Sequence, residues 1–274
     1  NDIIMARLDR LGEDGKRAVQ LASVIGRQFL VRLLRRVAGM GEQMEGLLRE
    51  LQALELIYEQ GLLPEPAYIF KHAVIQDVAY NSLLHERRRA LHRAVGYALE
   101  ELYPDRLPEH YEELAHHFSR GEDWAKAFDY LVHSGDRARD AYANPVALDL
   151  YAQAIEAARR VPAIPRVRLA EVHQRRCQVL TATQRLDEAH AEAKQMLPLA
   201  REISDRRLEG EALADIDYAH WMSFSSDQIA PLRPHIEQAS AIAREIGDNR
   251  LLARSLFIAA TVDQVEGGLG EAEA

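Results

Sequence analysis

Apolar residues recur at intervals of three and four along most of the chain, the spacing that gathers side chains on one face of an α-helix. Among the first 54 residues, such stretches cover residues 18–25, 30–37 and 44–54, and glycines separate them. Only two short runs read as strands, residues 56–59 and 68–70, and they flank a turn that contains Gly61 and Pro64. Residues 1–103 therefore predict three helices and a two-stranded wing.

A repeated pattern begins at about Tyr111. The segments AREISDRRL (residues 200–208) and AREIGDNRL (residues 243–251) agree at seven of nine positions, 43 residues apart. Small residues allow two antiparallel helices to approach closely, and a larger one fills the seam with the next repeat. In one unit, Gly135 takes the small position of the first helix, and the second helix carries Ala147, Tyr151 and Ala154. A looser copy has Cys177 on its first helix and Ala189, Ala193 and Met196 on its second.

This arrangement resembles the tetratricopeptide (TPR) pattern. The expected fold is therefore mainly α, with a TPR-like α-solenoid over residues 104–274 that is truncated in its last repeat. An insertion at residues 223–234 obscures the repeat register after residue 200. Residues 268–274 read as the start of a further helix, and the chain begins without a methionine. We therefore expect an excised part of a larger polypeptide.

Charge is distributed unevenly along the 274 residues, whose net charge is −9. Residues 1–103 hold 14 Lys/Arg and 14 Asp/Glu, whereas residues 104–274 hold 20 and 29. The helix that would read DNA, residues 42–54, has Glu42, Glu45 and Glu50 against Arg49 alone, and acidic side chains repel phosphates. Nucleic acid is therefore not an expected partner.

The remaining composition favours the cytoplasm. The single cysteine, Cys177, fits a reducing compartment. No apolar run approaches the roughly 18–20 residues needed to span a bilayer, so no membrane partner is expected.

Two sequence words, residues 22–29 (ASVIGRQF) and residues 68–92 (YIFKHAVIQDVAYNSLLHERRRALH), carry a family resemblance. Together they resemble the winged-helix region that follows the P-loop ATPase module of STAND-type signalling ATPases. The most similar group is the one fused to class III adenylate/guanylate cyclases or to serine/threonine kinases. The resemblance covers about residues 4–102. It implies a winged-helix adaptor, and an ATPase module upstream in the same polypeptide that binds ATP or ADP with magnesium.

His72 is the first candidate site residue. By the resemblance, it corresponds to a histidine that reaches the phosphates of the bound nucleotide and holds the resting, ADP-bound state. An imidazole can donate to a phosphate oxygen, and its charge responds to that anion. The alternative is a histidine that caps the start of a helix. The chain contains neither GxxxxGK[ST] nor GxGxxG, so no cofactor is expected in this fragment itself.

Other polar groups have simpler explanations. Arg87, Arg88, Arg89 and Arg93 either bind an anion or form salt bridges, for example with Glu86. Glu112 and His116 lie four residues apart near His110 and His117, but the motif is not HExxH and no third ligand is evident, so no metal is expected. No Gly-x-Ser-x-Gly elbow appears and Cys177 occupies a packing position, so the fragment is not expected to be an enzyme.

Aromatic side chains gather at the end of one first-type repeat helix, at Tyr218, Trp221, Met222 and Phe224. First-type helices line the concave face of a TPR solenoid, where aromatic anchors dominate recognition. The candidates that line this groove are Gln174, Gln178, Tyr218 and Trp221. The alternative is that the aromatic residues pack on the neighbouring repeat.

These observations lead to three hypotheses. The first is a non-catalytic regulatory or sensor region of a STAND-type ATPase, in which the repeats bind a protein, peptide or small ligand and the winged helix relays that event to the nucleotide-binding module. The second is a DNA-binding regulator that combines a winged helix with repeats. The third is a plain TPR scaffold without switching.

Overall fold

A computed structural model describes residues 2–41, 43–61, 66–161, 163–223 and 233–272. The chain forms two compact units, Asn1–Tyr130 and Leu131–Ala274, which meet within helix α8 (Trp124–Asp140). The division predicted from sequence after residue 103 stays a prediction.

The first unit contains the three strands that the structure describes. Its strands are β1 (Gln28–Leu30), β2 (Ile57–Gly61) and β3 (Ala67–Phe70). Its helices before α8 are α1 (Asp2–Asp9), α2 (Glu13–Ile25), α3 (Val31–Ala38), α4 (Gln43–Ala53), α5 (Ala73–Asn81), α6 (His85–Leu102), the short 3-10 helix η1 (Pro104–Glu109) and α7 (Tyr111–Arg120). The helices predicted at residues 18–25, 30–37 and 44–54 are confirmed as α2, α3 and α4.

The sheet has three strands, so the prediction of only two was wrong. All pairings are antiparallel in the order β1-β3-β2, with Phe29 opposite Tyr68 and Ile57 opposite Phe70. The missed strand, β1, is three residues long and lies directly before α3, so no alternation of apolar and polar residues marks it. It carries Phe29, which is buried against Phe70 with ring centroids 5.7 Å apart.

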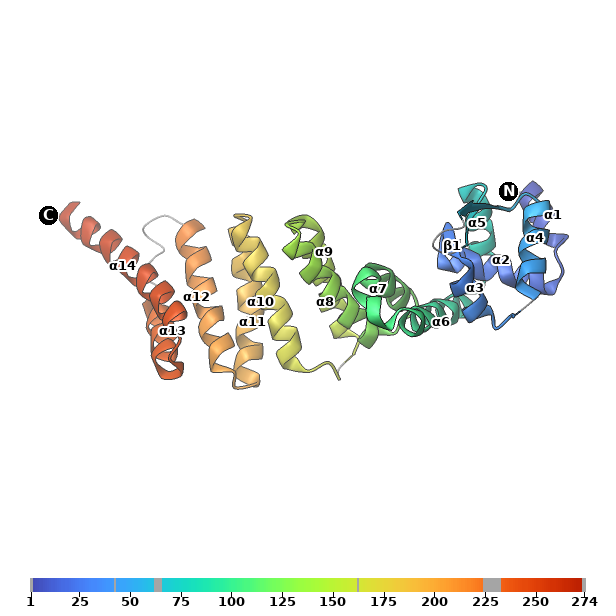
Figure 1. Ribbon diagram of the computed structural model, residues 1–274. Coiled ribbons are helices and arrows are strands. Elements are labelled where there is room, and N and C mark those ends of the chain that lie inside the picture. The colour runs from blue at the N-terminus through green and yellow to red at the C-terminus, as the bar shows by residue number, and fades with distance from the viewer. Residues whose placement is uncertain (1, 42, 62–65, 162, 224–232, 273–274) are drawn as a thin grey trace. The chain divides into compact units, whose positions relative to one another are not determined.

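The second unit is a stack of antiparallel helices, which confirms the predicted mainly α fold of helical repeats. Beyond α8 its helices are α9 (Asn144–Arg159), α10 (Arg166–Ala182), α11 (Leu186–Glu202), α12 (Arg206–Ser223), α13 (Arg233–Ile246) and α14 (Asn249–Ala272). Each packs against its neighbour in sequence, and Figure 1 shows α10, α11 and α12 standing side by side. Contacts also join α10 to α12 and α12 to α14, so the first helices of successive hairpins form a continuous row.

The small residues predicted between paired helices are buried there, and Tyr151, predicted at the seam with the next repeat, packs against the paired helix α8. Tyr151 is fully buried, and a Cβ added to Gly135 would lie 2.6 Å from its ring. The other predicted seam positions are also buried: Ala147, Ala154, Cys177, Ala189, Ala193 and Met196. A glycine in α8 is therefore what lets the Tyr151 ring lie against the α8 backbone.

The two nearly identical segments, residues 200–208 and 243–251, form the same connection between consecutive helices. In each, an aspartate follows a residue in the left-handed conformation, Ser204 (φ 57°) or Gly247 (φ 72°). The backbone N–H of Asp205 donates to Ala200 O at 3.0 Å, and that of Asp248 donates to Ala243 O at 2.9 Å. These bonds close the end of the preceding helix, and each aspartate side chain caps the next one.

Two sequence predictions concern the last repeats. The predicted insertion at residues 223–234 lies mostly outside the described residues, so the register there stays a prediction. Residues 268–272 continue α14 instead of starting a new helix, so that expectation was wrong. No helix within the described ranges is long and apolar enough to cross a membrane.

Candidate functional site

His72 lies where the sheet meets α5. It occupies the N-cap position of α5 in an extended conformation, but its side chain makes no capping hydrogen bond. The Nζ of the preceding residue, Lys71, lies 3.1 Å from Glu55 Oε2. This contact lowers the pKa of the Glu55 carboxyl. The His72 side chain is exposed. The helix-capping interpretation is therefore not supported, and the nucleotide-sensing role stays a prediction.

The arginines that open α6 are dispersed among local contacts. Arg88 Nε donates to Leu83 O at 2.9 Å and its guanidinium lies over the Tyr80 ring. Arg89 pairs with Glu86 at 3.1 Å, as predicted, and with Glu122 at 2.8 Å. Arg88 and Arg89 are therefore engaged in separate local contacts.

A buried chain of hydrogen bonds joins three helices of the first unit. Tyr80 Oη on α5 lies 3.0 Å from His92 Nε2 on α6, and His92 Nδ1 lies 3.0 Å from His117 Nδ1 on α7. Both histidines are buried, at 2% and 1% exposure. A neutral imidazole has one donor nitrogen and one acceptor nitrogen, and a tyrosine hydroxyl can donate or accept, so the chain is satisfied with its donors running in either direction.

Burial makes this histidine pair hard to protonate. It lowers the pKa of His92 to about 4 and that of His117 to about 3, and the neighbouring positive groups add to the effect. A cavity of about 220 Å³ adjoins the pair. Its polar lining includes Ser23, Gln76, Asp77, His92, His116 and Arg120.

Two of the residues considered for a metal site have other partners. His117 bonds His92, and His110 lies 3.1 Å from Glu113. Within the part of the chain that the structure describes, no group of three or more His, Cys, Asp or Glu side chains is arranged to hold a metal ion.

Ion pairs link the first helices of successive hairpins in the second unit. Asp136 on α8 lies 3.4 Å from Arg139 and 3.4 Å from Arg175 on α10. Further along, Arg254 on α14 pairs with Glu211 at 3.4 Å, and with Asp215, on α12. These bonds link α8 to α10 and α12 to α14, and α10 packs against α12. We call the row of side chains along these four helices the first-helix face.

The predicted groove residues fall into three groups. Gln178 is exposed on α10, three residues beyond Arg175, and so shares the first-helix face, whereas Gln174 is buried. Tyr218 packs against the buried cluster of Ile236, Ile258 and Val262, which favours the packing alternative for that residue. The side chain of Trp221 and residue Phe224 lie outside the described residues.

Two buried acids in this unit gave no sequence signal. Glu192 on α11 lies 2.6 Å from His173 Nδ1 and also pairs with Arg176. Asp217 on α12 is fully buried, and burial raises its pKa to about 8. Its Oδ1 lies 3.3 Å from His235 Nδ1 on α13, but neither atom makes a hydrogen bond. Both acids lie inside the helix stack, and Glu192 ties α11 to α10.

Cys177 is confirmed at a packing position. Its thiol is buried, Sγ lies 3.5 Å from Ala189 O, and burial raises its pKa. A thiol that stays protonated is a poor nucleophile.

No family model matches this chain, and no curated protein matches its sequence. Among solved structures it is similar to an aspartyl phosphate phosphatase F from Bacillus subtilis, with 14% identity and a TM-score of 0.45 over 95% of this chain and 71% of that one. It is also similar to a STAND protein with a tetratricopeptide repeat sensor from Pyrococcus horikoshii, with 13% identity and a TM-score of 0.33 over 96% of this chain and 42% of that one. At these identities and TM-scores, function has to be argued from the residues of this chain.

Proposed function

We propose that this chain is a non-catalytic regulatory region whose TPR-like repeats bind a protein or peptide ligand on the first-helix face. The observation that carries the proposal is the pair of ion-pair bridges that cross from α8 to α10 and from α12 to α14. Together with the packing of α10 against α12, they form a row of helices that has polar side chains, Gln178 among them, on one side. A rigid row of this kind reduces the entropy lost when an extended ligand binds.

A second part of the proposal assigns an adaptor role to the first unit. The order helix, strand, two helices and two strands supports a winged-helix-like adaptor, in keeping with the resemblance of residues 22–29 and 68–92. We propose that it relays ligand binding to a P-loop ATPase module of the same polypeptide, where ATP or ADP and magnesium would bind. The exposed His72, which makes no capping bond, is available for a nucleotide phosphate there.

A DNA-binding regulator is the second candidate function. The helix that would enter the groove, α4, exposes Glu45 and Glu50, and its Arg49 Nε donates to Glu45 O at 3.3 Å. Such a surface repels phosphates, which disfavours this function. A gel shift of a random DNA duplex at low salt that disappears when salt is added would support the DNA-binding function.

Peptide selection tests the binding proposal. Peptides selected from a displayed library on the intact chain are expected to lose about tenfold or more in affinity when Arg175→Glu and Gln178→Arg are combined. The matched control is Gln153→Arg with Arg159→Glu, two exposed positions on the second-type helix α9. The control is expected to change affinity by less than about twofold. Equal losses in both variants, measured by fluorescence anisotropy, would remove the first-helix face from the proposal.

A further inference from the structure

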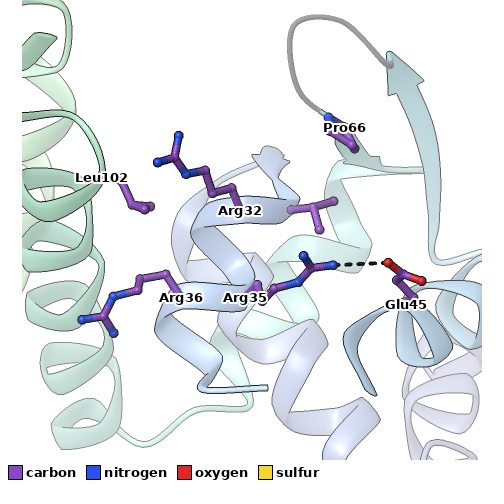
Figure 2. Close-up of a pocket in the computed structure, with 7 residues that line it drawn as sticks. Arg32, Arg35, Arg36, Glu45, Pro66 and Leu102 are labelled. Carbon is purple, nitrogen blue, oxygen red and sulfur yellow. Dashed lines mark ion pairs between the residues drawn. The ribbon is translucent and has the colours of Figure 1, made fainter. Parts of the chain in front are cut away.

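Three arginines on one helix of the first unit line a pocket that the proposed function does not use. Arg35 and Arg36 lie three and four residues after Arg32 on α3, and the pocket beside them has a volume of about 630 Å³. Figure 2 shows Arg32 and Arg36 extending from α3 toward Leu102 on α6, whereas Arg35 extends toward Glu45 on α4. The pocket therefore has guanidinium groups on two sides.

Two carboxylates of the chain already occupy part of this positive surface. Arg35 lies 3.5 Å from Glu45, and Arg36 pairs with Glu101 on α6. All four side chains are at least 44% exposed. Exposed ion pairs contribute little to stability, so an incoming carboxylate can displace either glutamate at small cost.

The rest of the pocket is apolar. Val31, Pro66 and Leu102 form its walls, and the Arg32 guanidinium lies over the Tyr103 ring, 5.7 Å from its centre. A free inorganic anion would leave these walls in contact with water. A ligand that matches both surfaces has anionic groups beside an aliphatic side chain.

We infer that this pocket binds an acidic peptide segment of a partner protein, with two carboxylates on the arginines and an aliphatic side chain between Val31, Pro66 and Leu102. The planar fork of arginine donors matches a carboxylate with two parallel hydrogen bonds. Glu45 and Glu101 hold the arginines in the absence of the partner. The site is separate from the first-helix face, and its failure would leave the repeat proposal standing.

The test uses the intact chain and a fluorescein-labelled peptide of Glu-Glu-Leu-Leu repeats, with a Gln-Gln-Leu-Leu peptide as the uncharged probe. Anisotropy is expected to show binding of the acidic probe only. Arg32→Ala combined with Arg36→Ala should weaken it by about tenfold or more, and Arg32→Lys with Arg36→Lys should weaken it less. The matched control is Arg87→Ala, an exposed arginine at the start of α6.

Removing the charges of Glu45 and Glu101 gives the most specific test, which is measured as a gain in affinity for the acidic peptide. Glu45→Gln with Glu101→Gln is expected to tighten binding several-fold, because the peptide no longer has to displace them. A merely structural role for these ion pairs would not produce that gain. The inference is overturned if the double glutamine variant binds no tighter, if Arg87→Ala weakens binding as much as the α3 variants, or if inorganic phosphate or duplex DNA binds this pocket while the acidic probe does not.

Discussion

Replacing Gly135 with valine is expected to lower the free energy of unfolding of the Leu131–Ala274 unit by about 2–3 kcal/mol. Even a Cβ at this position would lie 2.6 Å from Tyr151 Cε1 and 2.8 Å from Cδ1. The ring cannot move aside easily, because it is fully buried and its hydroxyl donates to Asp136 Oδ1 at 2.7 Å. The helices must therefore separate, which opens the seam between α8 and α9.

Urea unfolding measures this loss. The matched control is Gly46→Val in α4, where an added Cβ meets nothing within 4 Å. The combination of Gly135→Ala with Tyr151→Leu is expected to cost less than the sum of the two single changes, since the smaller side chain makes room for the methyl group. An unchanged midpoint for Gly135→Val would show that the α8–α9 seam is not the one described.

Acid is expected to destabilise the first unit well above the pH at which its carboxylates are protonated. The folded-state pKa values of His92 and His117 lie at about 4 and about 3, below the ordinary value of about 6.5. Above pH 6.5 both groups are neutral in folded and unfolded chains, and their contribution to stability is complete. As the pH falls from 6.5 toward 4, the unfolded chain takes up protons that the folded chain does not, so stability is lost. The expected loss at pH 5 is about 2 kcal/mol per histidine.

The measurement is urea unfolding at pH 7 and pH 5, followed by Trp124 fluorescence in a Trp221→Phe background. His92→Gln keeps a hydrogen-bonding side chain but removes the titrating group, so the difference between the two pH values is expected to fall by about half. His85→Gln, at the exposed start of the same helix, is the control and is expected to leave the difference unchanged. If His92→Gln behaves like the control, the buried pair does not govern acid stability.

The repeat architecture was predictable from sequence because its cause is local. Gly135 and Tyr151 act within one hairpin, and the two Ala-Arg-Glu-Ile segments lie where one hairpin joins the next, so the hairpin spacing is visible as a period. Strand β1 was not predictable in this way, since its three residues are a strand only because β3 lies alongside.

The same reason explains which site residues were missed. His92 and His117 are separated by 25 residues, and neither position is marked by a motif. Arg36 and Glu101 are separated by 65 residues, so the pocket on α3 exists only once α6 has packed there. Repeat register predicted that Gln174 and Gln178 line the groove, but Gln178 is exposed whereas Gln174 is buried. Register fixes the direction of a side chain, but it does not fix how closely the neighbouring helix covers that side chain.

The central claim is that ligand binding on the repeats controls a nucleotide held elsewhere in the parent polypeptide. The most direct test is the dissociation rate of ADP from that parent, with and without a peptide selected on the first-helix face. The peptide is expected to speed ADP release, and Arg175→Glu with Gln178→Arg is expected to abolish this effect. The His72→Ala variant is expected to release ADP faster without peptide. An ADP release rate that neither the peptide nor His72→Ala changes would contradict the central claim and leave a scaffold without switching.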